Sequence, residues 1–322
     1  MSAMRTAALL CLLLAAGTSD ATGVRGSPKL VVEEYRLFPC SVDARVPPVL
    51  PIRLPDSIGR KRERWRYDPP LSSDVDKINK VIGPLGYRLR RIERPTRCTP
   101  SYDFLKGDSV VVPLLCDIDG FMIDLRTDKF LFTATEDLQT GPPFGRDWLI
   151  LDGKPQPWEP SDHEYVAPLL LDGHLVTYDP EQAGNGFLRV VIKRDSQVVY
   201  VGRTRWNVCS NSIGNFGSDG HEWVLQYADT VVVNGSSLNR QLHCNAVFGY
   251  HVIHGAPFYL FAGDGTVRMR FGASVLPYTY DDVQRGGECG ESYFSPMGND
   301  NMVWFYARRN GWWYYVEAGV YD

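Results

Sequence analysis

The sequence predicts an all-β protein made of successive antiparallel hairpins, with one short helix on its N-terminal side. Three observations support this prediction. Aromatic residues, which favour strands, make up 12% of the 322 residues. From Tyr87 onward, the apolar runs are short, as strands are. Dipeptides that form tight turns follow or divide these runs: Asp152-Gly153, Asp172-Gly173, Asp264-Gly265 and Asn310-Gly311.

The first residues have the pattern of a secretory signal peptide. A basic opening ends at Arg5, an apolar run extends from Ala7 to Ala16, and small residues follow as far as Ala21. We therefore expect residues 1–21 to be removed from a protein that is secreted or held in the periplasm or cell envelope. The apolar run is too short to span a bilayer, and no later segment approaches the roughly eighteen residues that a transmembrane helix needs.

Six cysteines remain beyond this segment, an even number that favours disulfides in an exported chain. The candidates are Cys40, Cys98, Cys116, Cys209, Cys244 and Cys289. We favour a Cys98–Cys116 pair because each residue sits at the edge of neighbouring strand-like runs, although the sequence leaves the connectivity open. There is no C-x-x-C pattern, so neither a zinc ribbon nor a thioredoxin-like site is supported.

A proline-rich segment, residues 22–71, precedes the patterned part of the chain. Its prolines are too frequent for a helix or a central strand, so we expect an extended leader. It includes a dense basic run from Gly59 to Arg66. We interpret this run as a solvated linker, with binding to a polyanion or a membrane surface as the alternative.

A single helix is predicted directly after the leader. Ser73 is placed to cap it, with Asp76 three residues further on, and Gly83-Pro84 ends it. The apolar residues form one narrow face: Val75, Ile78 and Ile82. We expect this helix to cover one end of the sheet structure that follows.

The remaining residues of the 72–322 domain are predicted to form consecutive hairpins. The expected strand pairs are Leu188–Ile192 with Val198–Val201, Trp223–Tyr227 with Val231–Val233, Phe258–Phe261 with Val267–Phe271, and Met302–Ala307 with Trp312–Val316. A propeller-like arrangement is favoured because hairpins continue without a domain break, and a two-sheet sandwich is the alternative. The last hairpin is apolar on both faces, which predicts a position inside a packed body.

Several segments resemble a group of uncharacterised exported bacterial proteins with WG-type β-hairpin repeats. The resemblance lies in Ile78-Asn79, Gly86–Leu89, Gly220–Leu225, Pro257–Tyr259 and the ending Ala307–Glu317. It implies an extracytoplasmic β-hairpin protein, and it carries no catalytic residues and no substrate. The turns here are spaced more irregularly than in a clean WG repeat.

No catalytic constellation or metal site is predicted. His251 and His254 would diverge on a strand, because residues three apart point to opposite faces. The segment Asp117–Asp124 does not match a calcium loop, because its glycine is misplaced. The carboxylates that a glycoside hydrolase would need are present, but their spacing brings no pair together: Asp162, Glu164, Glu222 and Glu317.

The aromatic C-terminal hairpin is the most unusual part of the sequence. Core packing is the favoured interpretation of its aromatic residues, and a flat surface that stacks on a glycan or a protein partner is the alternative: Trp304, Trp312, Trp313 and Tyr315. We therefore expect a non-catalytic protein, without a cofactor, that is structural or binds an envelope or extracellular partner. The alternative is a secreted hydrolase of polysaccharides. A net charge of −4 argues against nucleic-acid binding.

Overall fold

The structure, a computed structural model, describes residues 30–37, 74–93, 100–124, 126–138, 145–159, 166–205, 213–218, 222–285 and 296–320. These residues are mostly β-strands, joined into antiparallel sheets. The predicted all-β class is confirmed. All four predicted hairpins form, as β10–β11, β13–β14, β17–β18 and β22–β23.

Within the described residues, five sheets follow one another along the chain, and the first four are meanders of sequential strands. Sheet I contains β2 (Tyr87–Ile92), β3 (Ser101–Lys106), β4 (Ser109–Asp124), β5 (Lys129–Asp137), β6 (Gly145–Leu151) and β7 (Lys154–Pro157). Sheet II contains β8 (Leu169–Leu171), β9 (His174–Gln182), β10 (Phe187–Arg194) and β11 (Gln197–Arg205). Sheet III contains β12 (Ile213–Ser218), β13 (Trp223–Tyr227), β14 (Thr230–Val233) and β15 (Ser236–Ser237).

Sheet IV contains β16 (Ala246–Ile253), β17 (Ala256–Gly263), β18 (Thr266–Phe271) and β19 (Ser274–Tyr280). Sheet V combines both ends of the described chain: β1 (Leu30–Arg36), β20 (Asp282–Val283), β21 (Met297–Gly298), β22 (Met302–Arg309) and β23 (Trp312–Val320). Two short helices accompany the sheets, α2 (Val75–Ile82), followed by a 3-10 turn at Gly83–Leu85, and α3 (Leu238–Leu242).

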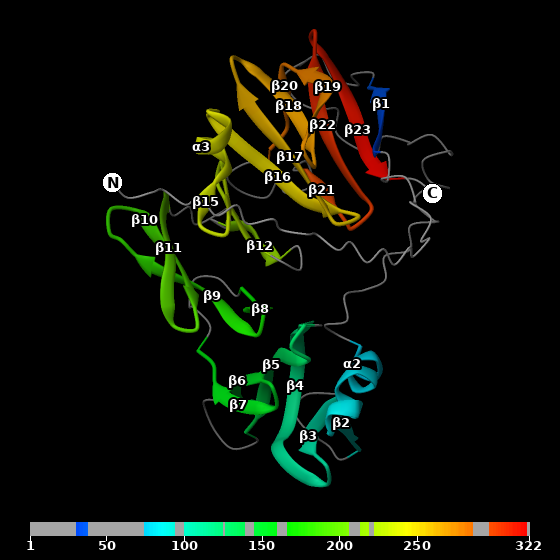
Figure 1. Cartoon of the computed structure of the whole chain (residues 1–322), viewed down its shortest axis with the longest axis vertical. Helices are drawn as coiled ribbons and strands as arrows, with labels where there is room; N and C mark the ends of the chain where they lie inside the picture. Colours follow the sequence, from blue (N-terminus) through cyan, green and yellow to red (C-terminus); the bar gives the residue numbers. More distant parts are fainter. Residues whose placement is uncertain are drawn as a thin grey trace, which may run out of the picture.

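Each sheet packs on the next one through a shared hydrophobic cluster. Representative buried pairs are Leu131 with Leu170 between sheets I and II, Ile192 with Leu225 between II and III, Val231 with Val247 between III and IV, and Phe258 with Phe305 between IV and V. The described sheets are antiparallel and stack in succession, and the choice between a propeller-like and a two-sheet arrangement stays a prediction. Sheets I and V lie at opposite ends of the molecule (Figure 1).

The turn dipeptides adopt the conformation that their sequence demands. Asp152, Asp172, Asp264 and Asn310 all have φ near +50°, and each is followed by a glycine with φ above +70°. This left-handed pair matches the twist of the strands on either side, and glycine reaches it without steric cost. The turns therefore fix the register of the hairpins.

Helix α2 begins one residue later than predicted. Asp74, not Ser73, is its N-cap, because the Asp74 carboxylate accepts hydrogen bonds from the main-chain N–H groups of Asp76 and Lys77. Ile78 and Ile82 are fully buried against sheet I. The helix therefore covers the face of sheet I that points away from sheet II, as expected.

Strand β1 lies within the segment predicted as an extended leader. It is an edge strand that pairs with β23 along its whole length, from Leu30 opposite Val320 to Arg36 opposite Tyr314. Glu34 accepts a bidentate pair of hydrogen bonds from Arg309, at 3.0 and 2.9 Å, and a third from the Tyr280 hydroxyl at 2.7 Å. These bonds attach the first described strand to sheets IV and V.

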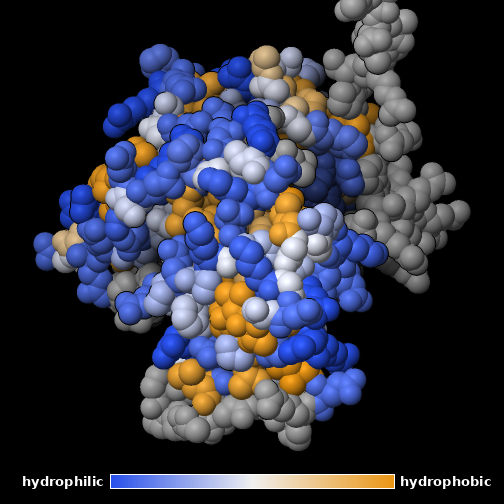
Figure 2. All heavy atoms as spheres, turned by 60° about the horizontal axis from the view of Figure 1, so that its bottom comes forward, coloured by the Kyte–Doolittle hydropathy of each residue, from blue (hydrophilic) through white to orange (hydrophobic). Residues whose placement is uncertain are grey.

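The surface seen from the sheet I end is dominated by hydrophilic residues, with hydrophobic residues in separate groups among them (Figure 2). Among the described residues, no helix is long and apolar enough to cross a membrane. The signal segment, residues 1–21, and the basic run at residues 59–66 lie outside the described residues.

The two described cysteines differ in state. Cys116 is disulfide-bonded. Cys98, Cys40, Cys209 and Cys289 lie outside the described residues, so the Cys98–Cys116 pair remains a prediction. Cys244 is a free thiol, and the prediction of a disulfide there is wrong for this structure. It follows α3 and is half-buried against sheet IV, with its thiol 3.5 Å from the Ala246 carbonyl, and burial raises the pKa of the thiol.

Candidate functional site

The aromatic residues singled out in the sequence are largely buried. On one face of sheet V, a cluster that we call the aromatic face contains Tyr35, Trp304, Tyr306, Trp313 and Tyr315. Trp313 is 4% exposed and Tyr315 is 2% exposed. Trp312 points to the other face; it is 39% exposed, with the Arg36 guanidinium 3.4 Å from its ring centre. Only Trp312 of the four predicted binding residues therefore has a large exposed fraction.

Two carboxylates face each other within the aromatic face. Glu33 on β1 lies directly opposite Glu317 on β23, and Tyr35 lies opposite Tyr315 in the same way. Each tyrosine hydroxyl donates to the glutamate of its own strand, at 2.5 Å for Tyr35 to Glu33 and 2.8 Å for Tyr315 to Glu317. Glu317 is only 1% exposed. The pair lies in a closed face, whereas a glycoside hydrolase needs its carboxylates in an open cleft.

An open groove lies where the strand ends of sheets III, IV and V meet. We call it the tip groove. It has a volume of about 360 Å3, and it is lined by Ser218, Val252, His254, Gly255, Asp300 and Asn301. This volume falls within the range of roughly 300–1,000 Å3 that is common for small-ligand sites. No pattern in the sequence indicates this groove, because its residues come from three separate hairpins.

Main-chain hydrogen bonds hold the tip groove in shape. His254, at the β16–β17 turn, adopts φ of +48°, and its N–H donates to the Asp300 carbonyl at 2.9 Å. The Asn299 side chain accepts from the N–H groups of Asn301 and Met302 at 2.9 and 3.0 Å. The Asn301 carbonyl accepts from Val320 at 3.0 Å. The two turns are therefore rigidly joined before any ligand arrives.

A histidine that is mostly buried forms part of the support behind the groove. His251 lies on β16, three residues before the turn residue His254, and its imidazole donates to the Pro296 carbonyl. Burial lowers the pKa of His251 to about 4, so the ring is neutral at pH 7. Gly298 lies against this ring, because a Cβ at that position would be 2.9 Å from His251 Nδ1. His251 lies on β16 and His254 lies in the turn after it, so the strand argument made from their spacing does not apply to the pair.

Three polar side chains at the rim of the groove are available to bind a ligand. Within the part of the chain that the structure describes, the side chains of His254, Asp300 and Asn301 make no hydrogen bond or ion pair. Together they offer a carboxylate acceptor, an amide that both donates and accepts, and an imidazole that can do either. The contact between His254 and Asp300 runs through the main chain, not through a side-chain acid–base pair.

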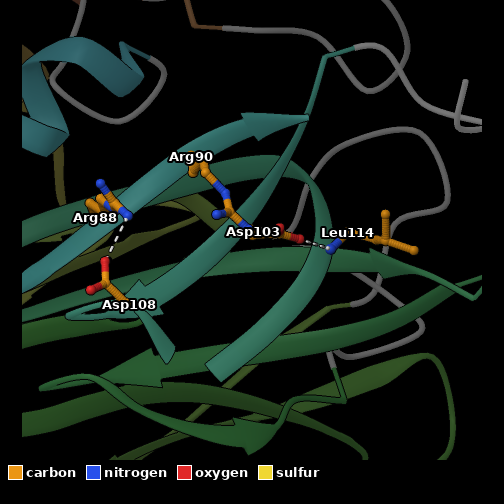
Figure 3. A network of polar contacts seen from close by, with 5 residues as sticks. All are labelled: Arg88, Arg90, Asp103, Asp108 and Leu114. Atoms are coloured by element: carbon orange, nitrogen blue, oxygen red, sulfur yellow. Dashed lines mark hydrogen bonds and ion pairs between the residues drawn. The ribbon is translucent and has the colours of Figure 1, made fainter. Parts of the chain in front are cut away.

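A polar network on sheet I has a structural explanation (Figure 3). Asp103 on β3 accepts from Arg90 at 2.8 Å and from the main-chain N–H of Leu114 at 3.3 Å, and nearby Arg88 meets Asp108 at 3.4 Å. Leu114 has φ of +54°, a conformation that is strained for leucine. Asp103 therefore stabilises an irregular point in strand β4.

Asp124 joins the turns of two sheets. Burial raises its pKa, but hydrogen bonds from Arg126, Thr127 and Gly173 outweigh this effect and hold the pKa below its usual value. Gly173 belongs to the β8–β9 turn of sheet II, so this carboxylate connects sheet II to sheet I. Asp124 therefore has a structural role in joining these turns. No group of metal ligands occurs among the described residues.

The remaining sequence candidates are not brought together. Glu222, just before β13 of sheet III, accepts a hydrogen bond from Asn234 at 3.1 Å, whereas Glu317 lies on sheet V. Asp162 and Glu164 lie outside the described residues. In a comparison with known proteins, no family model and no curated protein matches this chain.

Proposed function

We propose that this protein is exported through a cleaved signal peptide and acts without catalysis, by binding a glycan of the cell envelope or extracellular space in the tip groove. The observation that carries the proposal is the set of uncommitted polar side chains, His254, Asp300 and Asn301, around a rigid groove. Sugar hydroxyls donate and accept hydrogen bonds at once, so they suit a carboxylate, an amide and an imidazole set close together. Val252 supplies the apolar wall.

Export is supported by the N-terminal pattern and by the state of Cys116. Disulfides persist in oxidising compartments, and Cys116 is disulfide-bonded. A rigid groove also favours binding, because little ordering entropy is lost when the ligand arrives.

The alternative function is hydrolysis of a polysaccharide. Its support is the Glu33–Glu317 pair, which places two carboxylates opposite each other beside aromatic rings. The burial of Glu317 argues against it, since substrate must reach both carboxylates. Binding in the tip groove requires no structural rearrangement, because the groove is already open.

An array of neutral and acidic oligosaccharides, probed with the purified chain, tests the proposal. Each oligosaccharide that binds is then titrated by calorimetry against Asp300→Asn, His254→Gln and the matched control His174→Gln, which changes an exposed histidine outside the groove. We expect the two groove variants to lose at least tenfold in affinity, and the control to bind as the parent does. Binding to no oligosaccharide, or equal binding by all variants, would overturn the proposal. Release of new reducing ends would support hydrolysis instead.

A further inference from the structure

The aromatic face of sheet V is buried more deeply than a single sheet can bury its own side chains. Glu317, Tyr315 and Trp313 are all at most 4% exposed. Side chains stand out from a sheet, so a second layer about 10 Å away is needed to bury them. Sheet IV supplies that layer on the opposite face, through Phe305. Among the described elements, only those of sheets IV and V make extensive contact with β22 and β23. The residues that bury the aromatic face therefore remain to be assigned.

The segment that joins β1 to α2, residues 38–73, lies outside the described residues, but both of its ends are described. It begins at the aromatic face, because Leu37 belongs to the aromatic cluster and its N–H donates to the Trp313 carbonyl at 2.9 Å. It ends at Asp74, where α2 begins on sheet I, at the opposite end of the molecule (Figure 1). Crossing the stack of sheets takes about 40–50 Å, which requires about 15 extended residues. More than half of the segment is therefore available to stay beside sheet V.

The first half of this segment contains a sequence that suits the aromatic face. Residues 47–53 are Pro-Pro-Val-Leu-Pro-Ile-Arg, with prolines in P-x-x-P spacing and an arginine two residues after the last one. Such sequences favour the polyproline II conformation, and their prolines pack into grooves lined by aromatic side chains. An arginine beside them can form charge-assisted hydrogen bonds with carboxylates. The aromatic face has both features, because its rings surround the Glu33–Glu317 pair.

We propose that residues 47–53 of this chain dock on the aromatic face, with the prolines against its rings and the Arg53 guanidinium between Glu33 and Glu317. Two carboxylates that face each other on neighbouring strands repel, and a cation between them removes that repulsion. Residues 286–295, which adjoin β21 of sheet V, lack this chemistry, because they include two glutamates and no proline, lysine or arginine. Charge complementarity therefore favours residues 47–53 as the occupant.

The basic run from Gly59 to Arg66 is the competing occupant. It has more positive charge than residues 47–53, but it contains no proline and one aromatic residue. It also lies in the last 15 or so residues before α2, which the chain needs to reach sheet I. Docking of residues 47–53 keeps a polysaccharide away from the Glu33–Glu317 pair, so it agrees with binding in the tip groove and not with hydrolysis on the aromatic face.

Carbodiimide cross-linking of the full purified chain tests this contact. Arg53→Lys keeps the charge and adds a primary amine, which the carbodiimide joins to a neighbouring carboxylate as an amide, taking up the water that is lost. We expect mass spectrometry to find this amide at Glu33 or Glu317. The matched control is Arg45→Lys, the same change outside the proline sequence, and it should give no such amide. An amide from Lys61 to either glutamate would identify the basic run as the occupant and overturn the proposal, as would equal cross-linking in the two variants.

Hydroxyl-radical labelling of the full chain tests whether these residues bury the face. Arg53→Glu brings a third carboxylate to the Glu33–Glu317 pair, so we expect the labelling rate of Trp313 to rise at least threefold. Tyr280, which is fully buried between sheets IV and V, reports whether the fold is intact and should stay as protected as in the parent. Arg45→Glu is the matched control and should label as the parent does. Equal labelling of Trp313 in the parent and both variants would overturn the proposal.

Discussion

The aromatic face of sheet V and the tip groove differ in almost every respect. The first gathers large aromatic side chains that are dense in the sequence, and it is closed: Trp313 and Tyr315 are nearly inaccessible. The second gathers small polar residues that are scattered through the sequence, and it is open. Aromatic density therefore marks the area that a sheet buries, whereas the groups available for recognition gather where turns of separate sheets converge. Side chains of the two regions should therefore differ in how much they contribute to the stability of the fold.

The largest effect is expected on the aromatic face. Trp313→Ala removes a side chain that is 4% exposed, and we expect the free energy of unfolding to fall by about 3–5 kcal/mol. Urea denaturation measures this change. Trp312→Ala is the matched control, because that ring is 39% exposed and its main contact is Arg36; it should lose about 1 kcal/mol or less. Equal losses would mean that the face is not a core.

The support behind the groove should respond to pH. Because burial lowers the pKa of His251 to about 4, below the value near 6.5 of an unfolded histidine, the unfolded chain takes up a proton first as pH falls. The contribution of His251 is complete above about pH 6.5, and roughly 3 kcal/mol is lost by pH 4. Urea denaturation at pH 7 and pH 4.5 should show a smaller difference in His251→Gln than in the parent. Identical differences would contradict the buried neutral ring.

A smaller effect is expected at Gly298, beside the same histidine. A Cβ there would lie 2.8 Å from Val303 Cγ2 and 2.9 Å from both His251 Nδ1 and the Met302 carbonyl. We expect Gly298→Ala to destabilise the fold by about 1–3 kcal/mol. Gly83→Ala is the control, since its Cβ would meet nothing within 4 Å and its φ is −56°. Thermal unfolding of the two variants checks the difference, and equal melting temperatures would refute it.

The smallest effect on stability is expected at the rim of the groove. Asp300 is exposed and its side chain makes no described hydrogen bond, so Asp300→Asn should change the free energy of unfolding by no more than about 0.5 kcal/mol. Chemical denaturation at pH 7 measures this change. A loss as large as that of Trp313→Ala would mean that the rim is part of the core, and the contrast between the two regions would disappear.

Local sequence signals predicted the hairpins well. Asp264-Gly265 and Asn310-Gly311 specify two of the pairings within a few residues, and the weaker turn signals Asp195-Ser196 and Ala228-Asp229 mark the other two. The structure has all four predicted pairs. The helix was also predictable from local sequence. Its N-cap lies one residue later than predicted, because aspartate and serine can both cap a helix and Asp74 follows Ser73 directly. The two-faced apolar character of β22 and β23 correctly predicted burial on both sides.

Contacts between distant segments were not predictable from such signals. Strand β1 was not predicted, because residues 22–71 are rich in proline and because its partner β23 lies at the other end of the described chain. The tip groove depends on Ser218, His254 and Asp300 from three sheets, and no spacing in the sequence relates them. A charged residue on an apolar strand, such as Glu34 on β1, was the one signal that could have indicated a distant partner like Arg309.

The pairing of β1 with β23 has a consequence for the order of assembly. During synthesis, β1 leaves the ribosome before every other described strand, yet its hydrogen-bonding partner is the final one. Sheets I to IV are built from neighbouring segments and can form while the chain is still growing, but sheet V must close a loop of more than 270 residues, from Glu34 to Arg309. The pairing of β1 in sheet V is therefore a late step, because it can form only after β23 has been synthesised.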